Sequence, residues 1–178
     1  MVNQDKVNEA LLFAAKKHEG QKMKQPDVSY VAHLQGVCLE AINGCLNSQN
    51  HVDLEKVVIL ALLHDTIEDT NATYDEVKEI FGEDIANGVL ALTKDENIPH
   101  DDRMKDSLRR IKEQSVEVAI VKLSDRIFNL KDVPLKWDEA KVNQYKSQAQ
   151  LILDELGSAN EYLANRLKEK IENYKRLH

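Results

Sequence analysis

VVILALLHDTIED, residues 57–69, is the segment around which we expect the other parts of the chain to pack. Its first seven residues are all apolar, which is typical of a helix buried on every side. Two pairs of polar residues follow, His64 with Asp65 and then Glu68 with Asp69. Residues four apart share a face of a continuous α-helix, so we expect these four side chains to face one site.

Burial of these ionisable groups needs compensation. An unpaired charge that is removed from water costs several kcal/mol. A bound cation is the simplest arrangement that would offset this cost, so the segment favours a metal site or a catalytic cluster.

The remaining sequence predicts an all-α fold, with one compact multi-helix domain over residues 1–178. Strand-like alternation of apolar and polar residues is hard to find. Apolar residues recur at helical spacing in most of the chain, which predicts helices at 4–19, from about 33 to 44, from 53 onward, and at 73–82, 83–92, 103–114, 117–132, 138–155 and 159–176. Asp53 is a suitable N-cap, and Thr73 with Glu76 has the spacing of a capping box. Loops are expected at 21–29 and 93–102.

The helix predicted at 117–132 carries a single polar stripe. Lys122, Asp125, Arg126 and Asn129 are spaced so that they share one face, whereas the residues around them are mostly apolar. This stripe must therefore meet water, a partner or a ligand. We expect Arg126 to be structural and paired with a carboxylate, and Trp137 to be a packing anchor.

Composition narrows the possible functions. The formal net charge is -7 and the pI is about 5.4, which argues against a general nucleic-acid binder but allows a small anionic substrate near local lysines and arginines.

The residues at 1–13 do not have the pattern of a signal peptide, and no apolar run approaches the ~18 residues of a membrane span. We expect a cytoplasmic protein in which Cys38 and Cys45 are reduced thiols. Oligomeric state does not follow from the sequence.

Metal-ligand residue types occur in three of the predicted helices. His33, the pair His64-Asp65, and Asp125 together offer two imidazoles and two carboxylates. This mixture of nitrogen and oxygen donors suits a divalent transition ion such as Mn²⁺, Fe²⁺ or Zn²⁺. Glu68 and Asp69 are placed to take a proton from a water that the metal activates.

The order of these motifs resembles a known family. The segments AAKKHEGQKMK, SYVAH, ALLHDTIEDT, FG and KLSDRIFNL are similar to those of the HD metal-dependent phosphohydrolase superfamily, and within it to the RelA/SpoT-type small alarmone hydrolases. The likeness extends over roughly residues 7–155. It implies a mostly helical fold and a Mn²⁺-dependent enzyme that hydrolyses the 3′-diphosphate of guanosine tetra- or pentaphosphate to pyrophosphate and GDP or GTP.

The resemblance also implies roles for particular residues. By motif position, His33, His64, Asp65 and Asp125 resemble the metal ligands, whereas Glu68 and Asp69 resemble the carboxylates that activate and orient the attacking water. The expected substrate-binding residues are Lys22, Lys24, Tyr30 and Asn129, and also Lys94 and Arg103, to which phosphate contacts could pass because the loop that begins at residue 93 departs from the family pattern. Lys24 resembles a basic residue beside the purine and phosphates, and Asn129 an asparagine that contacts the nucleotide.

Two segments depart from the family pattern. Family members usually have Arg-Lys-Asp-Gly where this chain has Met23-Lys24-Gln25-Pro26, so it lacks the arginine expected to stack on guanine. Residues 93–96 read TKDE instead of the family's TDDK. Two alternatives therefore stay open: a phosphatase that acts on another nucleotide, such as NADPH or a nucleoside monophosphate, and a nucleotide-binding module without catalytic activity.

Overall fold

A computed structural model describes residues 1–23, 27–49 and 51–175. Its helices are α1 (Gln4–Lys17), α2 (Val31–Leu46), α3 (Leu54–Leu63), α4 (Thr66–Asp69), α5 (Tyr74–Phe81), α6 (Glu83–Leu92), α7 (Arg103–Lys112), α8 (Val116–Asn129), α9 (Glu139–Leu156) and α10 (Glu161–Asn173), with a 3₁₀ turn at Gly157–Ala159. Within the described residues, β-structure is limited to one isolated bridge between Lys22 and Ser29. The predicted all-α fold is confirmed.

The predicted helix starts agree with the hydrogen bonds at those positions. The Asp53 side chain accepts from the backbone N–H of Lys56 at 3.2 Å, as an N-cap does. Thr73 and Glu76 form the complete capping box, with reciprocal bonds of 3.2 and 2.9 Å. Helix ends were predicted less well. For example, α8 ends at Asn129, whereas the prediction was an end at residue 132.

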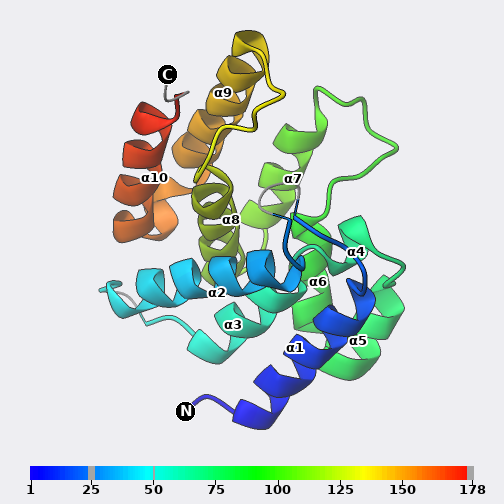
Figure 1. Ribbon diagram of the computed structural model, residues 1–178. Helices are drawn as coiled ribbons and strands as arrows, with labels where there is room; N and C mark the ends of the chain where they lie inside the picture. The colour runs from blue at the N-terminus through cyan, green and yellow to red at the C-terminus, as the bar shows by residue number, and fades with distance from the viewer. Residues whose placement is uncertain (24–26, 50, 176–178) are drawn as a thin grey trace.

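Helix α3 is the centre of the molecule. All its residues from Val57 to Leu63 are buried, because α1, α2, α6 and α8 pack around it. Figure 1 shows α2 and α3 crossing the middle of the molecule, with α9 and α10 on one side of α8 and with α1, α4 and α5 on the other. The apolar run therefore folds as the sequence predicts.

Helices α2 and α8 approach each other closely at a glycine. A Cβ atom added to Gly36 of α2 would lie 1.9 Å from Cε2 of Phe128 on α8, so no side chain fits there without movement. This contact lies beside the candidate metal site, since the rings of Phe128 and His33 pack edge-on with centroids 5.3 Å apart. The absence of a side chain at Gly36 thus allows the two helices to bring their polar residues together.

Helix α7 forms hydrogen bonds to the end of α6 and to the segment that follows it. Residues 93–102 make a long excursion at the edge of the molecule (Figure 1). Arg110 donates to the carbonyl oxygens of Leu90 and Thr93, and also pairs with Asp106 at 2.7 Å. The start of the loop is therefore tied to α7. In the described part of the chain, no helix combines the length and the apolar character needed to cross a membrane.

Candidate metal centre and substrate pocket

The polar end of the central segment is not one continuous helix. Helix α3 ends at Leu63, and α4 begins at Thr66 after a bend at Asp65, where φ is -100° and ψ is -1°. The Thr66 hydroxyl donates to the carbonyl of Leu63 at 2.6 Å and thereby satisfies one of the carbonyl groups at the end of α3. Our prediction of an unbroken helix to Asp69 is wrong. His64 and Asp65 therefore lie in the turn between the two helices, whereas Glu68 and Asp69 belong to α4.

Four side chains from three helical regions nevertheless converge. Nε2 of His33 lies 3.2 Å from Nε2 of His64, and Oδ2 of Asp65 lies 3.3 and 3.0 Å from these two nitrogens. Oδ1 of Asp125 lies 3.6 Å from His33 Nε2 and 3.8 Å from His64 Nε2. One donor atom each from His33, His64 and Asp125 fits within 4.8 Å of the others, and all three residues are buried.

The donors in this cluster fit a divalent metal ion. Nδ1 of His64 lies 2.8 Å from the carbonyl oxygen of Ala61, and because that oxygen can only accept, Nδ1 carries the hydrogen. In the neutral imidazole, the lone pair of His64 Nε2 then points at His33 and the two carboxylates. A cation between these groups would join two imidazoles and two carboxylates, a set that suits a divalent transition metal.

The carboxylates of this cluster stay ionised. Burial alone would raise the pKa of Asp65, but His64 and His33 outweigh burial and hold that pKa well below its ordinary value. For Asp125, the opposing influences are burial on one side and Lys122 and His64 on the other, and the pKa is again lowered. Burial disfavours a charged His64, yet Asp65 and Asp125 raise its pKa to about 9. The cluster thus favours positive charge at its centre.

Tyr30 links this cluster to the second pair of acids. Its hydroxyl lies 2.5 Å from Oδ2 of Asp65 and 3.3 Å from Oδ2 of Asp69. The Tyr30 ring stacks on His18, with centroids 4.8 Å apart, and His18 is itself buried. Burial, together with Asp65 and Glu68, raises the pKa of Asp69, which makes its carboxylate a better proton acceptor. Tyr30 therefore positions one acid of each pair.

Glu68 has different partners from Asp69. Its Oε1 pairs with Nζ of Lys94 at 2.6 Å, and its Oε2 accepts from the backbone N–H of Lys94 at 2.9 Å. Burial opposes the charge on Lys94, but Glu68 outweighs it and raises the pKa of that ammonium group. The residue that departs from the family pattern at position 94 thus contacts a predicted catalytic carboxylate.

A pocket of about 490 Å³ adjoins the cluster. His33 and Asp69 form part of its wall, and the other lining residues are Gln21, Lys22, Met23, Tyr30, Asn129, Lys131, Asp132, Pro134, Trp137, Tyr145 and Tyr174. Trp137 and Tyr145 pack edge-on, with centroids 4.9 Å apart. We predicted Trp137 as a packing anchor only, and we did not single out Tyr145, Tyr174, Lys131 or His18. The aromatic residues at 137, 145 and 174 lie before α9, in α9 and at the end of α10. Helical periodicity relates residues within one helix only, so the sequence could not indicate that these three side chains line one pocket.

Some of the predicted substrate-binding residues line this pocket and others do not. Tyr30, Lys22 and Asn129 line the pocket, although Asn129 donates to Oδ1 of Asp125 at 2.5 Å and Lys22 pairs with Asp27. Arg103 donates instead to the carbonyls of Ile98 and Glu96 within its own loop, and it is absent from the lining of this pocket. Lys24 lies outside the described residues. The binding roles of these residues stay predictions.

Arg126 is buried, and among the described residues it lacks the carboxylate partner that we expected. Only 5% of its surface is exposed, and Nε and Nη1 have no hydrogen-bond partner among the described residues. Its guanidinium lies over the ring of Tyr145, 4.2 Å from the centroid. The positive charge is therefore stabilised by an aromatic face that also lines the pocket.

The helical fold and the histidine-aspartate cluster define a class of protein, and sequence comparison agrees. The pattern of the HD domain family matches residues 10–168, and the chain belongs to this family. A solved structure titled "A metazoan ortholog of SpoT hydrolyzes ppGpp and plays a role in starvation responses" is similar over 99% of both chains, with a TM-score of 0.84 and 30% sequence identity.

Several similar proteins have names that state one activity. The chain is 34% identical over 166 residues to guanosine-3′,5′-bis(diphosphate) 3′-pyrophosphohydrolase MESH1 of Xenopus tropicalis, covering 90% of each protein. It is 33% identical to the human protein of the same name, covering 90% of this chain and 89% of that protein. A guanosine-3′,5′-bis(diphosphate) 3′-pyrophosphohydrolase of Aquifex aeolicus is 35% identical over 130 residues, which is 18% of its length.

Proposed function

We propose that this chain is a divalent-metal-dependent hydrolase that removes the 3′-diphosphate of guanosine tetra- or pentaphosphate as pyrophosphate and leaves GDP or GTP. The convergence of His33, His64, Asp65 and Asp125 beside a nucleotide-sized pocket carries the proposal. The similarity to named pyrophosphohydrolases over most of the chain supports the substrate. Residues 1–178 would act as one domain.

The proposed metal is Mn²⁺, held by the two histidines and two aspartates. Fe²⁺ and Zn²⁺ accept the same donor types. When bound, the ion supplies Lewis-acid activation of the attacking water and of the phosphate oxygens. Lys122 and Asn129 hold the Asp125 carboxylate from the side, at 3.5 and 2.5 Å, so that its orientation is set before an ion arrives.

The Glu68-Asp69 pair would take the proton that water loses. The water oxygen adds to the phosphorus nearest the ribose, the bond from that phosphorus to the ribose 3′-oxygen breaks, and the 3′-oxygen receives a proton. Asp69 is the acid that lines the pocket and is held by Tyr30, whereas Glu68 is held by both nitrogens of Lys94. Lys94 and Lys22 would contact phosphate oxygens, and Tyr30, Trp137 and Tyr145 would bound the nucleoside.

Pyrophosphate release tests this proposal. Purified protein loaded with Mn²⁺ and given guanosine tetraphosphate should release pyrophosphate. Glu68→Gln should lower kcat by about 10²- to 10⁴-fold, the usual contribution of a proton acceptor, while metal content stays the same. Glu79→Gln, an identical change at an exposed position of α5, is the matched control. Unchanged turnover in Glu68→Gln would remove Glu68 from the mechanism, and ligand binding without any turnover would favour a binding module.

One observation favours a second candidate function, hydrolysis of a phosphate monoester on another nucleotide. Met23 lines the pocket at the position where family members usually carry an arginine, so the charge next to the base differs. NADPH and nucleoside monophosphates are the substrates to compare. These compounds release orthophosphate, whereas the leading candidate releases pyrophosphate, so product analysis separates the two functions.

A further inference from the structure

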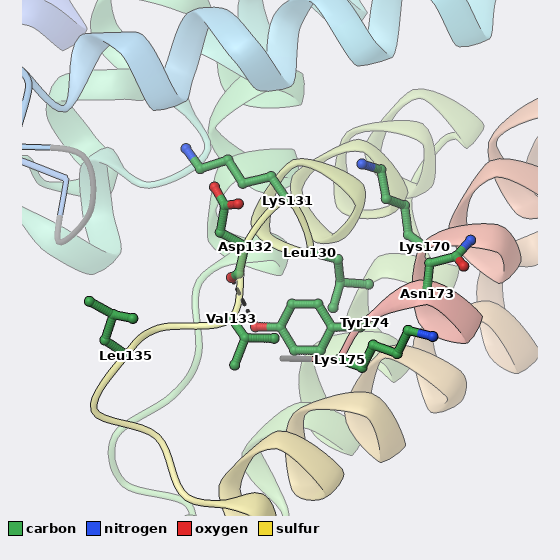
Figure 2. Close-up of a pocket in the computed structure, with 9 residues that line it drawn as sticks. All are labelled: Leu130, Lys131, Asp132, Val133, Leu135, Lys170, Asn173, Tyr174 and Lys175. Carbon is green, nitrogen blue, oxygen red and sulfur yellow. Dashed lines mark hydrogen bonds between the residues drawn. The ribbon is translucent and has the colours of Figure 1, made fainter. Parts of the chain in front are cut away.

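A second pocket lies beside the first, between the end of α8 and α10. Its volume is about 410 Å³, and its lining residues are Leu130, Lys131, Asp132, Val133, Leu135, Lys170, Asn173, Tyr174 and Lys175. Figure 2 shows the Tyr174 ring between Leu130 and Val133, which together give the pocket an apolar floor. Three lysines and a single aspartate belong to the lining, so the pocket is positively charged although the chain as a whole carries -7. We call it the lysine pocket.

The lysine pocket shares a wall with the substrate pocket. Lys131, Asp132 and Tyr174 line both, and the Tyr174 hydroxyl donates to the backbone carbonyl of Asp132 at 3.2 Å (Figure 2). Nζ of Lys131 lies over the Phe128 ring, 4.4 Å from its centroid, and Phe128 packs against His33. The Phe128 ring therefore connects Lys131, which lines the lysine pocket, to a candidate metal ligand.

The lysines of this pocket have no acidic partner within the described residues. In Figure 2, Lys131 and Lys170 both lie along the upper side of the pocket, where Lys131 ends above Asp132 and Lys170 ends above Leu130, whereas the end of Lys175 points away from them. Lys131 is exposed and Lys170 is half-buried. Two ammonium groups that lack an acidic partner among the described residues, at the edge of a pocket with an apolar floor, suit a compact anion such as a diphosphate.

The proposed substrate carries such an anion at the end opposite the scissile bond. We propose that the lysine pocket, through Lys131 and Lys170, holds the 5′-diphosphate of a nucleotide whose 3′-diphosphate lies at the metal centre. This inference rests on the proposed function, which supplies the substrate. The nucleoside would then occupy the pocket between the two phosphate sites, and the shared residues Lys131 and Tyr174 would mark the path from one to the other.

Equilibrium binding tests the proposal. Guanosine 3′,5′-bis(diphosphate) and guanosine 3′-diphosphate, which has a 5′-hydroxyl, are titrated calorimetrically into Mn²⁺-loaded Glu68→Gln protein, in which turnover should not consume the ligand. The 5′-diphosphate should improve affinity severalfold. Lys131→Gln with Lys170→Gln should reduce this advantage by about fivefold, as expected for two solvent-accessible charge contacts. Lys168→Gln, on the exposed face of α10 and outside the pocket, should retain the advantage.

The result that overturns the proposal is a 5′-diphosphate advantage that is absent in the parent protein or unchanged by the double substitution. A separate effector molecule in the lysine pocket would give this second result. Pyrophosphate release by protein that retains Glu68 tests the hydrolase separately. Its failure would refute the proposed function, whereas the binding comparison still decides whether the lysine pocket recognises the 5′-diphosphate.

Discussion

The candidate metal centre and the lysine pocket both lie along α8 and its continuation, but their charged groups are held differently. His33 and His64 are 3% exposed and Asp125 is 8% exposed, and the cluster is oriented by a hydrogen bond from His64 to the carbonyl of Ala61 and by hydrogen bonds from Tyr30 and Asn129. Lys131 and Lys175 are exposed, and the lysines at the second site have no acidic partner in the described chain. One site is preorganised by packing, whereas the other consists of long side chains around an apolar floor.

This difference sets the expected size of mutational effects. When a buried polar group loses its partner, the free energy of removing that group from water is no longer offset, whereas a charge at the surface is screened by water. Substitutions at the metal centre should therefore change metal affinity by orders of magnitude. Substitutions of the exposed lysines should change nucleotide affinity only a fewfold.

The largest effect is expected from Asp125→Ala. Removing one of four converging donors should weaken divalent-metal binding by more than about 100-fold and lower pyrophosphate release to match. Calorimetric titration with Mn²⁺ measures the affinity directly. Asp154→Ala, at an exposed position of α9, is the control. Metal affinity that survives in Asp125→Ala would show that this residue is not a ligand, and the contrast with the lysine pocket would disappear.

Gly36→Ala tests whether packing sets the geometry of the metal centre. Alanine in a helix gains about 0.5–1 kcal/mol over glycine, but its Cβ would lie 1.9 Å from Phe128, and overpacking costs about 1–3 kcal/mol. The free energy of unfolding should therefore fall by about 1–2 kcal/mol in urea titrations, with weaker metal binding. Gln35→Ala is the control at the adjacent exposed position. A more stable Gly36→Ala protein would mean that the α2–α8 contact is loose.

A smaller effect is expected from Tyr30→Phe. The change keeps the ring that stacks on His18 but removes the hydroxyl that contacts Asp65 and Asp69. Loss of a hydrogen bond to a metal ligand typically weakens metal affinity about 10-fold or more. The matched control is Tyr74→Phe, which removes the hydroxyl bonded to Asn87 at 2.8 Å. Equal metal affinity in both variants would exclude Tyr30 from positioning Asp65.

The smallest effect concerns the ion pairs of Asp106 in α7. Arg110, and then Arg109, hold the pKa of Asp106 below its ordinary value despite the opposing effect of burial. Because the folded pKa is the lower one, the pairs stabilise the protein above the unfolded pKa near 3.9, and this contribution is lost as the pH falls through the folded pKa.

Asp106→Asn should therefore cost less than about 1 kcal/mol at pH 7, and the difference from the unchanged protein should shrink as the pH falls below about 3.9 toward the folded pKa. Urea titrations at pH 7 and at a series of acidic pH values measure it, with Asp154→Asn as the control. A penalty that does not shrink at all in acid would show that Asp106 acts through something other than its charge.

Local signals in the sequence predicted much of the fold. Asp53 and the Thr73-Glu76 pair mark helix starts through hydrogen bonds that span three residues, so neighbouring sequence suffices to find them. The bend at Asp65 was missed because the run 57–69 contains no proline or glycine that would indicate it. The position of the Arg126 guanidinium over the Tyr145 ring was missed for a different reason, since Tyr145 is on another helix.

Residue types and their order in the chain determined that this protein is helical and that His33, His64, Asp65 and Asp125 are candidates for one metal site. Helix packing decided which of the other groups meet, Lys94 with Glu68 and Tyr30 with Asp65, and placed both Lys131 and Tyr174 in the lining of two pockets. The physical reason is the separation along the chain over which each kind of interaction acts. Capping and periodicity act within a few residues, whereas these contacts join segments whose distance depends on how the whole core packs around α3.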